Sequence, residues 1–80
     1  MFVIVNENNG AFSQFIPNLG TFLEVWVYLP DYHQNLPINV TIYPSEGIAQ
    51  STINNILSNR NQNNKNENLK IVPLVEWIEK

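Results

Sequence analysis

The segment from Thr21 to Leu29 constrains the fold most, because its side chains alternate along the chain with a period of two. One face is aliphatic and the other is aromatic with a single acid: Leu23, Val25, Val27 and Leu29 oppose Phe22, Glu24, Trp26 and Tyr28. This alternation is typical of a β-strand. Pro30 then ends the strand, since proline cannot donate a hydrogen bond to a ladder. We therefore expect a sheet built around residues 21–29.

Two shorter segments precede this strand and predict a hairpin near the N-terminus. Residues 2–5 are β-branched or aromatic, and residues 11–16 are expected to form the returning strand. Between them, Asn9 and Gly10 both tolerate positive φ, which a two-residue type I′ turn requires. A second turn is predicted over residues 17–20, where proline and glycine bound the sequence Pro-Asn-Leu-Gly.

Prolines also bound the region that follows. Residues 31–37 predict a loop, because they begin after Pro30 and end on a second proline. Residues 38–43 predict a half-buried strand that stops at Pro44. Its expected inner face is aliphatic and its expected outer face is polar: Ile38, Val40 and Ile42 oppose Asn39, Thr41 and Tyr43.

A helix is predicted from about residue 46 to residue 58. Ser45 is a suitable N-cap, because its hydroxyl can accept a hydrogen bond from a free backbone amide one turn on. Glu46 lies in the first turn, where the helix dipole favours an anion. Apolar side chains recur at the helical period and form one stripe, which consists of Ala49, Ile53, Ile56 and Leu57.

The last third of the chain begins with its most polar stretch. Residues 59–68 hold six of the fourteen asparagines and no apolar residue, so we expect a flexible loop there. A final strand is predicted over about residues 69–75, but Pro73 leaves a second possibility open. In that alternative the strand ends near Pro73, which becomes the first residue of a short terminal helix carrying Leu74, Trp77 and Ile78.

These elements predict one α+β domain over residues 1–80. We expect a single small antiparallel or mixed sheet of four or five strands, with an N-terminal hairpin. The helix at 46–58 would pack on one face, against the aliphatic sides of the strands. A chain of this length without cysteine has a small core and no disulfide, so it often depends on a partner or on self-association.

Composition excludes several classes of function. Four basic residues against seven acidic ones disfavour duplex nucleic-acid binding, which needs clustered Lys and Arg. No cysteine and one histidine leave no metal-ligand set, so we expect neither a metal nor another cofactor. Asp31 and His33 lie in one predicted loop, but no nucleophile motif surrounds any serine, and we predict that the chain is not an enzyme.

Location is predicted from two further absences in the sequence. No apolar run approaches the roughly 20 residues of a membrane span. The apolar residues 2–5 are too few for a signal peptide and have no basic residue before them. We therefore expect a cytoplasmic protein that does not insert into a membrane.

The aromatic side chains provide the candidate site, an interaction surface composed of Phe22, Glu24, Trp26, Tyr28, Tyr43 and Trp77. Trp and Tyr are enriched at protein interfaces, where charges are depleted. The main hypothesis is a non-catalytic protein–protein interaction module that forms a homodimer, through an exposed edge strand or this aromatic face. A phage or mobile-element protein that inhibits a host factor is compatible with the small size.

Two other interpretations of the aromatic face stay open. Aromatic rings on a sheet can bind a small ligand or stack on bases of single-stranded nucleic acid, although such binders usually add a cationic groove. Alternatively, the N-terminal hairpin or the terminal segment around Trp77 folds across this face and makes a second core. Glu24 is either a general acid or ligand contact within that face, a solvent-exposed glutamate at the sheet surface, or the ion-pair partner of a lysine on a neighbouring strand.

Overall fold

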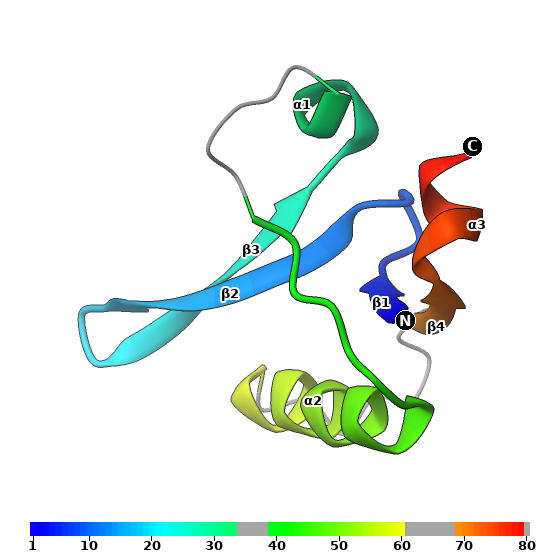
Figure 1. The fold of residues 1–80 in the computed structure, drawn as a ribbon. Coiled ribbons are helices and arrows are strands. Elements are labelled where there is room, and N and C mark those ends of the chain that lie inside the picture. The colour runs from blue at the N-terminus through cyan, green and yellow to red at the C-terminus, as the bar shows by residue number, and fades with distance from the viewer. Residues whose placement is uncertain (34–38, 61–68, 80) are drawn as a thin grey trace.

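The computed structural model, which describes residues 1–33, 39–60 and 69–79, contains one antiparallel sheet with helices on both faces (Figure 1). The strands are β1 (Phe2–Val5), β2 (Ala11–Asn18), β3 (Thr21–Val27) and β4 (Lys70–Pro73), and they lie in the order β3-β2-β1-β4. The helices are α1 (Leu29–His33), α2 (Glu46–Asn59) and α3 (Leu74–Ile78). The predicted α+β class, with its N-terminal hairpin and one main helix, is confirmed.

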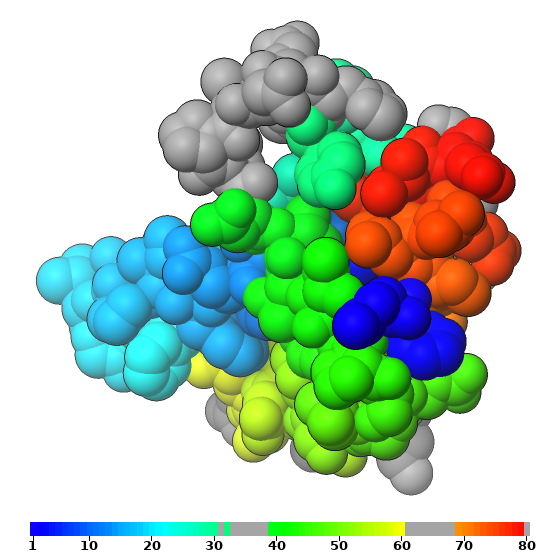
Figure 2. All heavy atoms as spheres, viewed as in Figure 1, coloured from blue at the N-terminus to red at the C-terminus, as the bar shows by residue number. Residues whose placement is uncertain are grey.

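The sheet divides into two parts because β1 and β2 separate soon after their turn. β1 pairs with β4 along its whole length, from Phe2 opposite Pro73 to Val5 opposite Lys70. It pairs with β2 only where Val5 faces Ala11. Consequently the β2–β3 hairpin extends away from the rest of the chain, as the blue and cyan projection in Figure 2 shows.

Residues 39–43, which we call the wedge segment, lie between β1 and β2 (Figure 1). The Thr41 amide donates to the Phe12 carbonyl at 3.1 Å, and Tyr43 exchanges two backbone hydrogen bonds with Phe2 at 2.8 and 2.9 Å. The predicted strand over 38–43 is therefore wrong, since the described residues 39–43 form only one isolated bridge. Two of the predicted orientations are also wrong, because Ile42 is exposed and Tyr43 is buried. Val40 is half-buried and Thr41 is exposed, as predicted, and Ile38 lies outside the described residues.

A β-bulge in β2 makes this contact possible. The register with β3 shifts between Phe12 and Gln14, so that Ser13 is the extra residue. Ser13 then bonds the wedge segment: its hydroxyl donates to the Asn39 carbonyl, and its backbone carbonyl accepts from the Thr41 hydroxyl. The bulge also places two aromatic rings three residues apart, those of Phe12 and Phe15, on the same face of the sheet.

Both turns differ in detail from the prediction. The first is a three-residue loop in which Asn9 alone has positive φ, 66°, and the Asn6 amide donates to the Gly10 carbonyl at 2.9 Å. Gly10 is needed there for space, because a Cβ would lie 2.6 Å from a ring carbon of Tyr28. The second turn has Leu19 and Gly20 at its centre, with φ values of 49° and 81°, as in a type I′ turn.

The two short helices replace segments that were predicted otherwise. β3 ends at Val27, and α1 occupies the start of the predicted loop. Pro30 is tolerated because the first turn of a helix does not use its backbone amides as donors. At the other end of the chain, β4 stops at Pro73 and α3 follows, so the strand-then-helix alternative is confirmed and a strand continuing to residue 75 is wrong.

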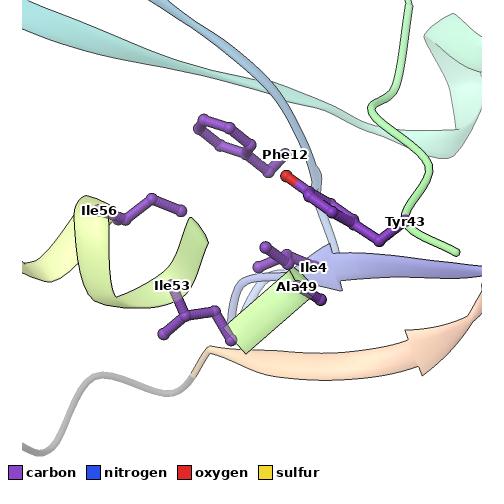
Figure 3. Packing of buried hydrophobic residues seen from close by; sticks show 6 residues of the cluster. All are labelled: Ile4, Phe12, Tyr43, Ala49, Ile53 and Ile56. Atoms are coloured by element: carbon purple, nitrogen blue, oxygen red, sulfur yellow. The ribbon is translucent and has the colours of Figure 1, made fainter. Parts of the chain in front are cut away.

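Helix α2 forms nearly as predicted and covers one face of the sheet. The Ser45 hydroxyl accepts from the Ile48 amide at 3.3 Å, which confirms the N-cap. The predicted stripe faces the sheet, and its buried members pack among side chains from β1, β2 and the wedge segment. Figure 3 shows this α2 core: Ile4, Phe12, Tyr43, Ala49, Ile53 and Ile56. Asn59 ends α2, and the remainder of the predicted flexible loop, from residue 61, lies outside the described residues.

A second core lies on the opposite face of the sheet. It consists of Val3, Val5, Ala11 and Trp77, with side chains of α1 and α3 packed around it. The aliphatic side of β3 belongs to this face, because Val27 is paired with Ala11. Trp26, by contrast, packs against the α2 core. The expectation that α2 covers the aliphatic side of β3 is therefore wrong.

Candidate interaction surface

The six residues predicted as an interaction surface do not lie on one surface. Tyr43 is buried in the α2 core and Trp77 in the second core. The Trp77 indole N–H donates to the Asn9 carbonyl at 2.9 Å, and its ring meets that of Tyr32 edge to face. In the folded chain these two aromatics therefore stabilise the interior rather than present a contact surface.

Glu24 and Trp26 are half-buried and are linked to the end of α2. The Arg60 guanidinium donates to both carboxylate oxygens of Glu24, at 2.6 and 2.7 Å, and the Trp26 indole N–H donates to the same group at 3.2 Å. Arg60 is the C-cap of α2, so this bidentate pair ties the helix end to β3. Glu24 thus has an ion-pair role, with an arginine in place of the predicted lysine.

Phe22 and Tyr28 are the two predicted residues that are exposed. The Tyr28 ring covers Gly10, and its hydroxyl accepts from the Asn6 side-chain amide at 3.3 Å. Phe22 lies on the projecting hairpin, where its ring meets that of Phe15 at a centroid distance of 6.2 Å. Among the six, Phe22 is therefore the aromatic that is best placed to contact another molecule.

The buried phenol of Tyr43 should make the stability of the fold depend on pH in the alkaline range. Burial raises the pKa of its phenol above the usual 10.0, and a hydrogen bond with Thr52 opposes part of that rise. Above about pH 10 the unfolded chain has therefore lost a proton that the folded chain keeps, so the free energy of unfolding should fall as pH rises further. Urea unfolding of wild type and Tyr43→Phe at about pH 9 and about pH 11 measures this. A decline of the same size in both proteins would contradict it.

Four exposed apolar side chains lie at the end of the β2–β3 hairpin, and of these the sequence analysis predicted only Phe22. We call these the hairpin patch: Ile16 and Leu23 on one face of the hairpin, Phe22 on the other, and Leu19 in the turn that joins the strands. Leu19 is 98% exposed and has a φ of 49°, a left-handed conformation that leucine rarely adopts. The available signal was the Leu19-Gly20 pair between two apolar strands, at a position where asparagine or glycine is usual.

A pocket adjoins the hairpin patch. Its volume is about 270 Å³, and it is lined by Phe15, Phe22, Asn55 and Asn59. The two aromatic rings come from the hairpin and the two amides from α2, so the pocket lies between these elements. Its apolar walls and neutral polar groups suit an uncharged side chain, and the four described residues that line it include no acid or base for proton transfer.

Other kinds of site find no support in the described part of the chain. Residues 1–33, 39–60 and 69–79 contain no group of three or more His, Cys, Asp or Glu side chains that could hold a metal ion. None of the helices described is long and apolar enough to cross a membrane. Comparison with protein families, curated proteins and solved structures found no match to this chain.

Proposed function

We propose that the chain is a non-catalytic protein-interaction module and that the hairpin patch is its contact surface. The observation that carries this proposal is the backbone of Leu19. A left-handed residue other than glycine or asparagine costs about 1–2 kcal/mol, and the exposed side chain gains nothing from burial within the described chain. Such conformational cost tends to be retained where it serves binding.

A partner that covers Leu19 would offset the conformational cost of its left-handed backbone. Burying one leucine side chain is worth about 1.5–3 kcal/mol, which offsets the cost of the left-handed backbone. Phe22 and the adjacent pocket would enlarge the contact with an aromatic anchor, the kind of residue that dominates binding energy at interfaces. A cytoplasmic homodimer is the form of this proposal that we favour.

The alternative, binding of a small ligand or of single-stranded nucleic acid by sheet aromatics, has weaker support. Tyr43 is buried and Trp26 is packed under α2, so neither presents an open ring face on which a base could stack. The nearest described cation, Arg60, is already held by Glu24. The hairpin patch therefore fits an apolar protein surface better than a nucleotide.

Leu19→Asn should separate stability from binding. Asparagine tolerates the left-handed conformation, so the free energy of unfolding should rise by about 1 kcal/mol, measured by urea denaturation. In the same variant a photo-cross-linking phenylalanine analogue at position 22 should form several-fold fewer adducts with other polypeptides. The adducts are counted in cells that naturally make the protein. Their number is compared with that from the same probe in a chain that keeps Leu19.

The matched control is Val75→Asn, which removes an exposed apolar side chain from α3 but changes no left-handed residue. It should leave the adducts from position 22 unchanged. The proposal would be overturned if the probe formed no protein adduct in the Leu19 background. It would also be overturned if Leu19→Asn left the adduct yield at its original level.

A further inference from the structure

The end strand β3 leaves one row of backbone groups without a strand partner among the described residues. β3 is the last strand of the sheet, and its only ladder is with β2. The Asn59 side-chain amide donates to the Phe22 carbonyl at 3.2 Å, so this carbonyl points away from β2. Since backbone direction alternates along a strand, the amides and carbonyls of Glu24 and Trp26 point the same way.

This edge lacks the features that usually prevent strands from pairing between molecules. Such features are short length, lysine, proline or a bulge. The opposite edge has three of them, because β4 is four residues long and contains Lys70 and Pro73. Pro17 lies on the part of β2 that pairs with β3 but extends beyond the contact with β1. β3 is seven residues long, with neither lysine nor proline.

The sequence of β3 is complementary to itself in the antiparallel direction. If two copies pair about a two-fold axis at Glu24, the centre of the strand, all seven residues find a partner. Phe22 then lies opposite Trp26 of the other copy, and Leu23 lies opposite Val25 on the other face. Aromatic and aliphatic cross-strand pairs of this kind stabilise sheets.

The charge at the centre of this pairing is already neutralised. Two glutamates directly opposite each other would repel. Here each Glu24 carboxylate accepts two hydrogen bonds from Arg60 of its own chain. The two copies would therefore bring together two carboxylate–guanidinium pairs of zero net charge rather than two isolated anions, which lowers the repulsion between the carboxylates.

We propose that β3 pairs with β3 of a second copy of this chain, antiparallel and centred on Glu24, to form a continuous eight-stranded sheet. This pairing deepens the proposed interaction function and rests on it. The Trp26 amide of the second copy replaces the Asn59 side chain at the Phe22 carbonyl. Pairing of two edge strands through their main chains is an established mode of protein association.

Disulfide trapping tests both the pairing and its register, since a cysteine-free chain allows one thiol per variant. Residues 23 and 25 of opposite copies form a non-hydrogen-bonded pair with Cα atoms about 4.5 Å apart, within disulfide range. Leu23→Cys and Val25→Cys are mixed in equal amounts in a glutathione buffer. The mixed dimer should exceed the two homodimers together several-fold, whereas random collision gives equal amounts.

Leu23→Cys mixed with Val75→Cys is the matched control, because Val75 is also exposed but lies on α3. It should give only the random distribution, and all three variants should keep the wild-type circular dichroism spectrum. A random distribution for the 23–25 mixture, or an excess of a homodimer, overturns the self-pairing. If the disulfide test fails but position 22 still forms protein adducts, the chain is an interaction module with a different partner. If position 22 forms no adducts, both the interaction function and the self-pairing are wrong.

Discussion

Replacing Trp77 with alanine should lower the free energy of unfolding by about 3–5 kcal/mol, because it empties the centre of the second core. The indole is fully buried beside Val3, Val5 and Ala11, and its N–H satisfies the Asn9 carbonyl. A chain of 80 residues has a total stability of only about 4–12 kcal/mol. The variant should therefore be partly unfolded at room temperature. Urea denaturation followed by far-UV circular dichroism measures this without depending on tryptophan fluorescence.

Trp77→Phe is the control for this prediction. It keeps an aromatic ring in the core but removes the hydrogen bond to Asn9, so it should lose less stability than the alanine variant. If Trp77→Ala were as stable as wild type, Trp77 would not be buried in solution. The second core would then not exist as described, and Trp77 would again be available as an interaction residue.

Truncating Ile56 to alanine should lower the free energy of unfolding by about 2–5 kcal/mol, because it leaves a cavity in the α2 core on the other face of the sheet. Ile56 is fully buried between α2 and the sheet, in contact with the α2 core (Figure 3). Ile48 lies on the same helix but is exposed, so it provides a matched truncation. Ile48→Ala should change the free energy of unfolding by less than about 1 kcal/mol.

The difference between these two isoleucine variants is the quantity to measure, by urea denaturation under identical conditions. Both substitutions remove the same atoms and place the same residue in a helix, so helix propensity cancels in the comparison. Similar losses for Ile48 and Ile56 would mean that α2 does not dock through the predicted stripe. The assignment of Trp26 to the α2 core would then also be wrong.

Local signals in the sequence were sufficient for most of the elements. The β-branched run at the start, the Ser45 cap and the isoleucine stripe each depend on neighbouring residues, and each feature has the predicted structure. Pro73 predicted two alternatives because proline suits both the end of a strand and the start of a helix. Packing of Trp77 against β1 accompanies the helical outcome.

The faces of β3 could not be assigned, because both sides of the strand are apolar. Periodicity shows that two faces exist, but it does not show which one a distant helix covers. That choice depends on the bulge at Ser13, which brings Phe12 and Phe15 to the same side as Trp26. A bulge is a tertiary feature here, since Ser13 is held by Asn39 and Thr41, residues far along the chain.

The strand prediction for the wedge segment was wrong for a related reason. Alternation over residues 38–43 predicted a strand, but a strand needs a neighbour along its whole length. The space between β1 and β2 widens from their turn, so the segment meets one strand at Thr41 and the other at Tyr43. Packing in the α2 core then determines that Tyr43 points inward, where alternation alone placed it outside.

The candidate site could be predicted only from residue type, because the sequence does not show which aromatic side chains are buried. Aromatic content identified Phe22 correctly as an exposed residue, but it also included Tyr43 and Trp77, which are buried. Burial depends on how α2 and α3 cover the sheet, which residue type does not encode. Leu19 was missed because leucine normally indicates a core position, and only its place in the turn shows that it lies at the hairpin tip.

Amide hydrogen exchange of the wild-type chain, followed by NMR at increasing protein concentration, decides whether the β3 edge pairs. The amides of Phe22, Glu24 and Trp26 point to the open edge and should gain protection as concentration rises. Those of Leu23 and Val25 face β2 and should be protected at every concentration. Edge amides that exchange rapidly and equally at all concentrations would contradict pairing of β3 with a second copy.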